Sequence, residues 1–531
     1  MLLKTLAALG LRWASGTFAN SFGSALYPPA APNEAMVYAR VIELKNAGAK
    51  DGNLLATFEN WYTESPTNIQ TNGSAAPFVI LESADSGTTW STIAEVYDPQ
   101  TGSGHPASYM YQPFLFEFPQ TLGTYPAGTI LLVGNTVPAD GSANMDSVGS
   151  WQQGGPGGSG IWEPFLYLNS QGQLVAVFSD ERDNTHHSQK LVHVVSDDGG
   201  DTWGPVVEDV ASGAQPDRPG MATVAKMGDK GQYVMSYEFC GQPNCVVHYK
   251  LSDDGVTWNA PDIGHPVQTT DGLYGGASPY IAWVSETNSL VLSAHFVWTS
   301  MNDQQSEESY RAIFVNSNGG QGLWNWAPSP WRVSNASESC NANYSPNLLP
   351  LGYGGLVRYT ARLAQALQDS VKKARWNNYG GSWSINGGAY SVSTDSNTDL
   401  ALTGSTGWSN YSASVQVQLG SSAVNAGRFT RVSLPSTGVN SFKGYAAYLM
   451  AGSGNLTLLG SVQVNGGLQQ GTWYQLDFEA SGFQLNVTVS SVGGSTTTSL
   501  TAQDSSYSQG MIGLYATGGS AAFQNVEVDC T

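Results

Sequence analysis

Three stretches of the chain share the pattern Asp-x-Gly-x-Thr-Trp: Asp85-Ser-Gly87-Thr-Thr89-Trp90, Asp198-Gly-Gly200-Asp-Thr202-Trp203 and Asp253-Asp-Gly255-Val-Thr257-Trp258. Each follows an apolar segment, and a degenerate copy occurs at Asn318-Gly-Gly320, which is followed by Trp324. In such a turn the Asp side chain accepts hydrogen bonds from backbone N–H groups, the Gly takes a positive φ, and the Trp packs against the sheet. The repeats therefore predict hairpin turns in an all-β fold.

These repeats resemble the Asp-box of the sialidase-type β-propeller, in which four-stranded blades are arranged radially. Successive copies are 113 and 55 positions apart, which fits one or two blades between them. Helical periodicity is almost absent, and residues 21–356 give room for six blades of about 45 to 55 residues each. The resemblance implies a six-bladed β-propeller in which the Asp-box residues are structural rather than catalytic.

The segment 357–376 has a different pattern, because Leu363, Leu367 and Val371 recur every four positions and basic residues follow them. Apolar spacing of this kind, with cations near the C-terminal end, is typical of a helix. We therefore expect a helical connector over these residues.

Residues 377–531 are rich in Ser, Gly, Thr and Val, and Tyr411–Leu419 alternates polar and apolar residues as a strand does. The ending, Gly510-Met-Ile-Gly-Leu-Tyr515 followed by Ala522-Phe-Gln-Asn-Val-Glu-Val528, resembles the concanavalin-like jelly roll that is appended to secreted glycosidases, such as carbohydrate-binding module family 66. This resemblance implies a β-sandwich over 377–531, either a carbohydrate-binding domain or a plain structural one.

Composition and charge exclude several classes of protein. The 531 residues carry 41 Asp and Glu against 21 Lys and Arg, so the formal net charge is −20. Such a charge repels phosphate backbones and argues against nucleic acid as a partner. Aromatic residues make up 11% of the chain, which is ample for a hydrophobic core. No apolar run of about 20 residues follows the first 20, so we expect no membrane span.

The N-terminus predicts export. Residues 1–20 carry the basic Lys4, a short apolar stretch over Leu6–Leu11 and small residues after it, which is the order of a secretory signal peptide. Six Asn-x-Ser/Thr sequons permit glycosylation, at Asn72, Asn335, Asn343, Asn410, Asn455 and Asn486. We therefore expect a secreted, monomeric glycoprotein.

The four cysteines fit the same compartment. Cys240 and Cys245 are close enough in the sequence to close a small loop, which would leave Cys340 and Cys530 to pair, although four cysteines allow three connectivities. No Cys and His residues have zinc-site spacing. We expect no metal and no cofactor.

Two glutamates stand out as candidate catalytic groups. Glu163 lies between Trp162 and Pro164 at the start of an apolar strand, and bulky apolar neighbours raise the pKa of a carboxyl group as a general acid requires. Glu238 interrupts the apolar strand 232–240, where a solitary carboxylate is costly unless it is hydrogen-bonded or functional. Upstream of it, Arg218 is a candidate cationic partner.

Two further segments hold candidate ligand contacts. The charged segment Phe178–Lys190 includes His186 and His187, and either could reach a ligand, although such a run is as often a solvated turn. Tyr344 follows Cys340, and a Tyr beside a carboxylate is the nucleophile arrangement of sialidases. Taken alone, Tyr344 is equally well explained as a packing residue.

Several motifs, taken in chain order, are similar to those of glycoside hydrolase family 93: Tyr111-Gln-Pro-Phe-Leu-Phe-Glu117 with Tyr125-Pro-Ala-Gly-Thr129, Ile161-Trp-Glu-Pro-Phe165, Ser179-Asp-Glu-Arg-Asp183 with Gln189-Lys-Leu-Val-His193, Arg218-Pro-Gly-Met221 and Ser236-Tyr-Glu-Phe-Cys240. The similarity covers roughly residues 30–360. It implies a secreted exo-α-1,5-L-arabinanase on a six-bladed propeller, which releases arabinobiose from the non-reducing end of plant cell-wall arabinan with retention of configuration.

Carried over residue by residue, the resemblance implies Glu163 as acid/base, Glu238 as nucleophile and Tyr344 as a supporting active-site residue. Retention implies carboxyl groups about 5 to 5.5 Å apart. Candidate substrate contacts are the Trp side chains, which could stack on sugar faces, together with other polar or aromatic residues near the motifs: Trp162, Trp61, Trp151, Tyr111, Arg218, His186 and Arg40.

Three alternatives use the same fold. A sialidase would bind a carboxylate sugar with three arginines, and Arg40, Arg218 and Arg311 are available, although Arg40 lacks the Ile and Pro that follow the first arginine in sialidases. A polysaccharide lyase would need a Tyr or His base and an acidic sugar. A lectin would bind a glycan without catalysis. The weak arginine triad favours a neutral polysaccharide as substrate.

Overall fold

The computed structural model describes residues 34–62, 77–97, 108–138, 146–147, 160–228, 231–299, 304–310, 312–328, 344–350, 357–360, 376–386, 389–393, 399–404, 406–434 and 442–530. These residues form two compact units. The first holds the described residues of 34–324 with 344–350 and 357–360, and the second holds 325–328 with 376–530. The predicted signal peptide lies outside the described residues.

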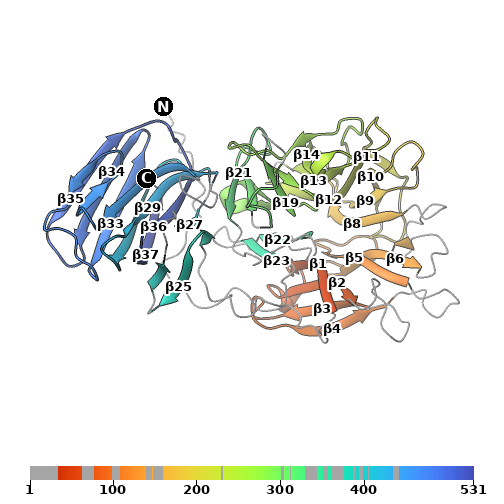
Figure 1. Cartoon of the computed structure of the whole chain (residues 1–531). Coiled ribbons are helices and arrows are strands. Elements are labelled where there is room, and N and C mark those ends of the chain that lie inside the picture. Colours follow the sequence, from red (N-terminus) through yellow and green to blue (C-terminus); the bar gives the residue numbers. More distant parts are fainter. Residues whose placement is uncertain are drawn as a thin grey trace, which may run out of the picture. The chain divides into compact units, whose positions relative to one another are not determined.

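The first unit is built of antiparallel sheets in which most strands pair with the next strand along the chain; the exceptions are the pairs β14–β16, β16–β19 and β18–β20 (Figure 1). The first three are β1(Glu34–Glu43)-β2(Leu54–Tyr62)-β3(Phe78–Ser83)-β4(Ser91–Val96), β5(Ser108–Glu117)-β6(Ile130–Pro138)-β7(Asp146–Ser147) and β8(Ile161–Leu168)-β9(Leu174–Asp180)-β10(Lys190–Ser196)-β11(Val207–Val210). The next joins β12(Arg218–Met227), β13(Gln232–Cys240), β14(Val246–Ser252), β15(His265–Pro266), β16(Leu273–Gly276) and β19(Phe296–Thr299). The remaining strands are β17(Tyr280–Val284), β18(Ser289–Ser293) and β20(Ala312–Asn316) in one sheet and β22(Asn347–Pro350) and β23(Val357–Thr360) in another.

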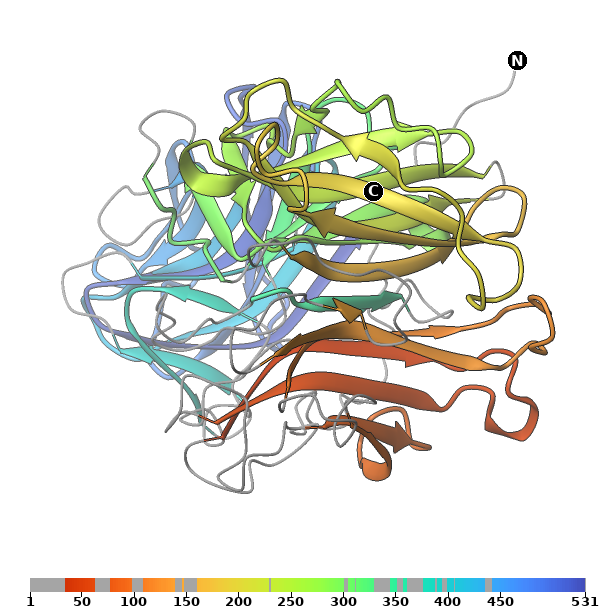
Figure 2. The same ribbon diagram turned by 90° about the vertical axis from the view of Figure 1, so that its right-hand side faces the viewer.

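The first strands of these sheets are neighbours in a cyclic order. β1 packs on β5, β5 on β8, β8 on β12, β12 on β17, β17 on β22, and β22 on β1. Figure 2 shows the same sheets from a second side. This is the propeller-like, all-β arrangement that the repeats predict, and the count of six blades stays a prediction.

A bulge recurs near the start of the first strands. The strand register shifts within β1, β5, β8 and β12, and each shift contains one residue with φ between 55° and 57°: Tyr38, Gln112, Glu163 and Met221. Ser278 and Ser345, just before β17 and β22, have φ of 46°. A bulge of this kind bends the strand and redirects a side chain. The strained backbone of Glu163 is thus part of a repeated feature.

The Asp-containing turns are held by hydrogen bonds that stay within a few residues. Asp85 Oδ1 accepts from the Thr89 N–H at 2.8 Å, and the Ser83 hydroxyl accepts from the Gly87 N–H at 2.8 Å. Asp198 repeats this pattern. In the third turn the prediction of Asp253 is wrong, because Asp254 accepts the backbone bonds of the turn. That turn is one residue shorter, so the capping carboxylate moves by one position.

The second unit is a sandwich of two seven-stranded antiparallel sheets (Figure 1). One has the order β24(Asn377–Tyr379), β27(Asp399–Thr403), β36(Met511–Thr517), β29(Asn425–Ser433), β30(Lys443–Met450), β31(Asn455–Thr457), β32(Ser461–Gln463). The other has the order β25(Ser382–Asn386), β26(Ala389–Ser393), β37(Ser520–Cys530), β28(Tyr411–Leu419), β33(Trp473–Ser481), β34(Gln484–Ser491), β35(Thr497–Gln503). β28 alternates buried and half-buried residues over its whole length, as its sequence predicts.

The start of the predicted helical connector differs from the sequence-based expectation. The helical connector is wrong at its start, because Val357–Thr360 form β23, which pairs with β22; residues 361–375 lie outside the described residues. The second unit also includes β21(Asn325–Pro328), where the backbone N–H of the buried Trp326 donates to the Thr406 hydroxyl at 2.9 Å. The described residues hold no helix long and apolar enough to cross a membrane.

Candidate active site

Glu163 lies half-buried in the bulge of β8, and both of its carboxylate oxygens are hydrogen-bonded. Oε2 accepts from the Ser179 hydroxyl at 2.6 Å and from the Met221 N–H at 3.1 Å. Oε1 accepts from Gln112 Nε2 at 3.4 Å. The donors come from β9, β12 and β5, so three sheets position this carboxyl group.

Burial, and after it the negative charge of Glu238, raise the pKa of Glu163 to about 7, although the Ser179 and Met221 hydrogen bonds act in the opposite direction. A carboxyl group with a pKa near 7 holds its proton at mildly acidic pH, as a general acid must. The sequence-based expectation of a raised pKa at this position agrees with the structure.

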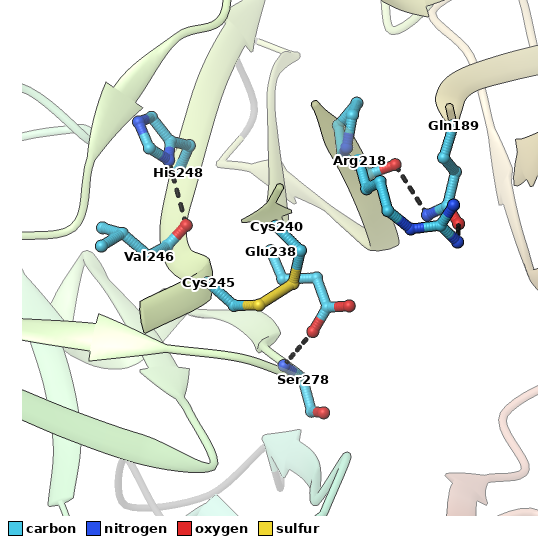
Figure 3. The surroundings of a disulfide bond; sticks show 9 residues. Gln189, Arg218, Glu238, Cys240, Cys245, Val246, His248 and Ser278 are labelled. Atoms are coloured by element: carbon cyan, nitrogen blue, oxygen red, sulfur yellow. Dashed lines mark hydrogen bonds between the residues drawn. A yellow bond between two sulfur atoms is a disulfide. The ribbon is translucent and has the colours of Figure 1, made fainter. Parts of the chain in front are cut away.

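Glu238 lies on β13, and its Oε2 accepts from the Ser278 N–H at 2.8 Å (Figure 3). Burial raises its pKa, while the Ser278 bond and the positive charge of Arg218 act in the opposite direction. Glu238 therefore has two interactions that favour its ionised form. Its negative charge, in turn, raises the pKa of Glu163. The fold thus brings the two predicted carboxyl groups close enough for the charge of one to change the pKa of the other.

The disulfide Cys240–Cys245, which the sequence predicts, flanks Glu238 (Figure 3). Cys240 follows Glu238 by two positions in β13, and the carbonyl of Cys245 accepts from the Ala277 N–H at 2.8 Å. Ala277 precedes Ser278, the donor to Glu238. The disulfide thus braces both sides of the Glu238–Ser278 hydrogen bond. The side chains of Cys340 and Cys530 lie outside the described part of the chain.

Replacing both Cys240 and Cys245 by Ser is expected to lower the free energy of unfolding by about 2 kcal/mol, because a closed loop of this length restricts the unfolded chain. The same double variant should turn over substrate more slowly, because the Ser278 N–H is held less firmly against Glu238. Urea unfolding and steady-state kinetics measure both effects. Unchanged stability together with unchanged turnover would contradict the bracing role.

Tyr344 lies near both carboxylates. Burial raises the pKa of its hydroxyl far above the ordinary value, and the charges of Glu163 and Glu238 raise it further. The ring packs against Val37, Tyr38 and Met221 and meets the His295 ring edge-on at 5.8 Å. Tyr344 therefore lies close to the two glutamates, and its role as a supporting active-site residue stays a prediction.

Trp162 and Arg218 are joined through Glu181. The Trp162 indole donates to Glu181 Oε2 at 3.0 Å, and the Arg218 guanidinium pairs with Glu181 Oε1. Arg218 also donates to Gln189 Oε1 at 2.7 Å. Because Arg218 acts on the pKa of Glu238 as well, this network lies beside the two carboxylates.

Arg40 does not fit a substrate contact. Only 2% of its surface is exposed, and its guanidinium donates to the Ser345 carbonyl and hydroxyl at 2.9 and 2.7 Å. It also stacks on the Tyr38 ring at 3.9 Å. Arg40 supports the backbone next to Tyr344, so the arginine that a sialidase would use first for a carboxylate sugar is not accessible here.

The other predicted contacts have different outcomes. His186 is exposed, and its ring bonds to Asp183 at 2.7 Å, as expected for the solvated-turn interpretation of its loop. Tyr111 is half-buried on β5, directly before Gln112. The side chain of Trp61 and all of Trp151 lie outside the described residues.

Sequence reasoning missed the residues that hold the glutamates: Gln112, Asn135, Ser179, Ser278 and the buried Glu59, which accepts from the Gln112 N–H at 3.0 Å. One signal was present, because Tyr111-Gln-Pro-Phe114 repeats the pattern of Trp162-Glu-Pro-Phe165. The described residues include no group of three or more His, Cys, Asp or Glu side chains that could hold a metal ion.

Two neighbouring carboxyl groups, one with a pKa near 7 and one bonded in ways that favour its charge, are the arrangement that glycosidases use. On a propeller-like fold, this pair of carboxyl groups marks the site as the candidate active site of a glycoside hydrolase.

Comparison with solved structures agrees. The chain is 28% identical to the family 93 α-L-arabinofuranosidase of Fusarium graminearum, solved with arabinobiose (63% of this chain and 95% of that one, TM-score 0.48). It is 31% identical to the α-L-arabinanase of Penicillium chrysogenum, also solved with arabinobiose (60% of this chain and 86% of that one, TM-score 0.47). On this sequence identity, rather than on the superposition, the chain belongs to glycoside hydrolase family 93.

The C-terminal region has other relatives. The family model of the 3-keto-alpha-glucoside-1,2-lyase-like domain matches residues 364–529. The carbohydrate-binding module CBM66 of Bacillus subtilis is 17% identical (29% of this chain and 94% of that one, TM-score 0.25). No curated protein matches the chain. That the sandwich binds carbohydrate stays a prediction.

Proposed function

We propose that this protein is a secreted, retaining exo-glycosidase on a six-bladed propeller that hydrolyses linear α-1,5-L-arabinan from the non-reducing end and releases arabinobiose. The observation that carries the proposal is the pair of electrostatically coupled carboxyl groups, both with a raised pKa. Glu163 has a pKa near 7, while Glu238 is bonded to the Ser278 N–H and lies in the field of Arg218. The two relatives solved with arabinobiose favour an arabinan substrate.

In the first step the Glu238 carboxylate attacks the anomeric carbon and forms a glycosyl ester. The glycosidic C–O bond breaks, and the proton of Glu163 goes to the leaving oxygen. In the second step the Glu163 carboxylate takes a proton from water, the water oxygen bonds to the anomeric carbon, and the ester bond to Glu238 breaks. Two inversions give net retention, and Glu163 ends protonated again.

Product analysis on linear arabinan tests this function. We expect arabinobiose as the sole early product, and proton NMR of fresh digests should show the α anomer first. Branched arabinan, sialosides and uronic-acid glycans serve as comparison substrates. Release of a monosaccharide, appearance of the β anomer first, or an unsaturated product absorbing in the ultraviolet would each contradict the proposal.

A further inference from the structure

Gln112 is the counterpart of Glu163 in the neighbouring sheet. Each residue follows a large aromatic residue and precedes Pro-Phe, and each lies in a bulge with φ of 55° or 57°. The two Phe rings of the motifs, Phe114 and Phe165, contact each other with centroids 4.4 Å apart. The same local structure thus presents an amide from β5 beside a carboxyl group from β8.

The orientation of the Gln112 amide is fixed by an unambiguous donor. The backbone N–H of Glu163 can only donate, and it lies 3.0 Å from Gln112 Oε1. Asn135 Nδ2 donates to the same oxygen at 2.5 Å. Gln112 Nε2 therefore points toward Glu163 Oε1, 3.4 Å away.

The two carboxyl oxygens of Glu163 differ in the hydrogen bonds they accept, and this decides which of them can hold the acid proton. Oε2 lies 2.6 Å from the Ser179 hydroxyl and 3.1 Å from the Met221 N–H, which is shared with Ser179 Oγ at 3.2 Å. Because Ser179 Oγ already accepts from that N–H, its hydroxyl is placed to donate to Oε2, and the two donors occupy the lone pairs of Oε2. Among the residues that the structure describes, the hydrogen bond of Oε1 is the longer one from Gln112 Nε2. The proton of the neutral acid therefore belongs on Oε1.

We propose that Gln112, held by Asn135, is a positioning residue that fixes Oε1 of Glu163 as the oxygen that delivers the catalytic proton and stabilises the carboxylate left behind. This inference rests on the proposed function. Glu59 anchors the Gln112 backbone through its N–H, so changing only the Gln112 side chain leaves that bond in place.

The test is Gln112→Met, which keeps the size of the side chain and removes its amide. On linear arabinan we expect kcat/KM to fall about 10-fold or more, because a small misplacement of the acid slows proton transfer. On a dinitrophenyl arabinobioside, whose leaving group needs no proton, kcat/KM should stay within about 2-fold. Gln120→Met is the control, because this exposed glutamine donates its amide N–H to the Gly172 carbonyl at 3.0 Å, away from the two glutamates.

The pH profile supplies a readout that a merely structural role would not move. Losing a donor to the ionised form should raise the pKa of Glu163, so the alkaline limb of kcat/KM on arabinan should move up by roughly 0.5 pH unit or more. Equal losses on both substrates, or an unmoved limb, would overturn the proposal.

A measurement without substrate separates this inference from the function on which it rests. Glutamate labelled with ¹³C at Cδ, with the Glu163 signal assigned by its absence in Glu163→Gln, gives the titration of Glu163 directly. If the wild type does not cleave arabinan, the proposed function fails, while an upward shift in Gln112→Met still supports the Gln112–Glu163 bond. An unshifted titration would refute that bond whatever the activity.

Discussion

Glu238→Ala is expected to lower kcat on linear arabinan by about 10⁴-fold or more, because the covalent step loses its nucleophile. The Ser278 N–H, which donates to Glu238 in the wild type, then has no carboxylate to bond, and the truncated side chain leaves space beside it. Initial rates measured at several substrate concentrations give the loss in kcat.

Rescue by azide tests directly whether Glu238 is the nucleophile. A small anion can occupy the space left in Glu238→Ala and attack the anomeric carbon of a dinitrophenyl arabinobioside in place of the carboxylate. The product should be the glycosyl azide of inverted configuration. Glu95→Ala, at an exposed glutamate on β4, is the matched control and should keep wild-type turnover. Full turnover by Glu238→Ala without azide would place the nucleophile elsewhere.

Glu163→Gln is expected to lower kcat/KM on arabinan by about 10²- to 10⁴-fold, because the leaving oxygen is no longer protonated. The sign of the pH effect follows from the raised pKa. The neutral form of Glu163 is the acid, it persists up to a pH of about 7, and its loss above that pH lowers kcat/KM in the wild type. Glu163→Gln should therefore have no alkaline limb.

The same reagent distinguishes the two glutamates. With azide and the activated substrate, Glu163→Ala should form the glycosyl azide of retained configuration, because Glu238 still makes the covalent intermediate and azide then replaces water. Hydrolysis of the activated substrate should show the normal first step, seen as a burst of dinitrophenol. An alkaline limb that persists in Glu163→Gln would assign that limb to another group.

Features with short-range causes were predictable from the chain alone. The turns at Asp85 and Asp198 are closed by bonds to residues at most four positions away, and the Cys240–Cys245 loop spans only five. In β28 the alternation of apolar and polar residues in the sequence matches the alternation of buried and half-buried side chains in the strand. Glu163 and Glu238 could be picked out because a carboxyl group inside an apolar strand is costly, and the family resemblance supplied their expected roles.

Tertiary structure decided what depends on distant segments. Arg40 has the sequence context of a ligand contact but is buried against Ser345, 305 positions away. Residues 357–360 form a strand because β22 offers a pairing edge, which outweighs their weak helical pattern. The proton-carrying oxygen of Glu163 is set by donors from three other strands, β5, β9 and β12, which only the packing of the sheets brings together. The chain by itself determines an all-β protein with two notable glutamates, because strand pattern and turn chemistry act between near neighbours. The pairing of those glutamates and the raised pKa of each arise from burial and from charges that the folded sheets bring close.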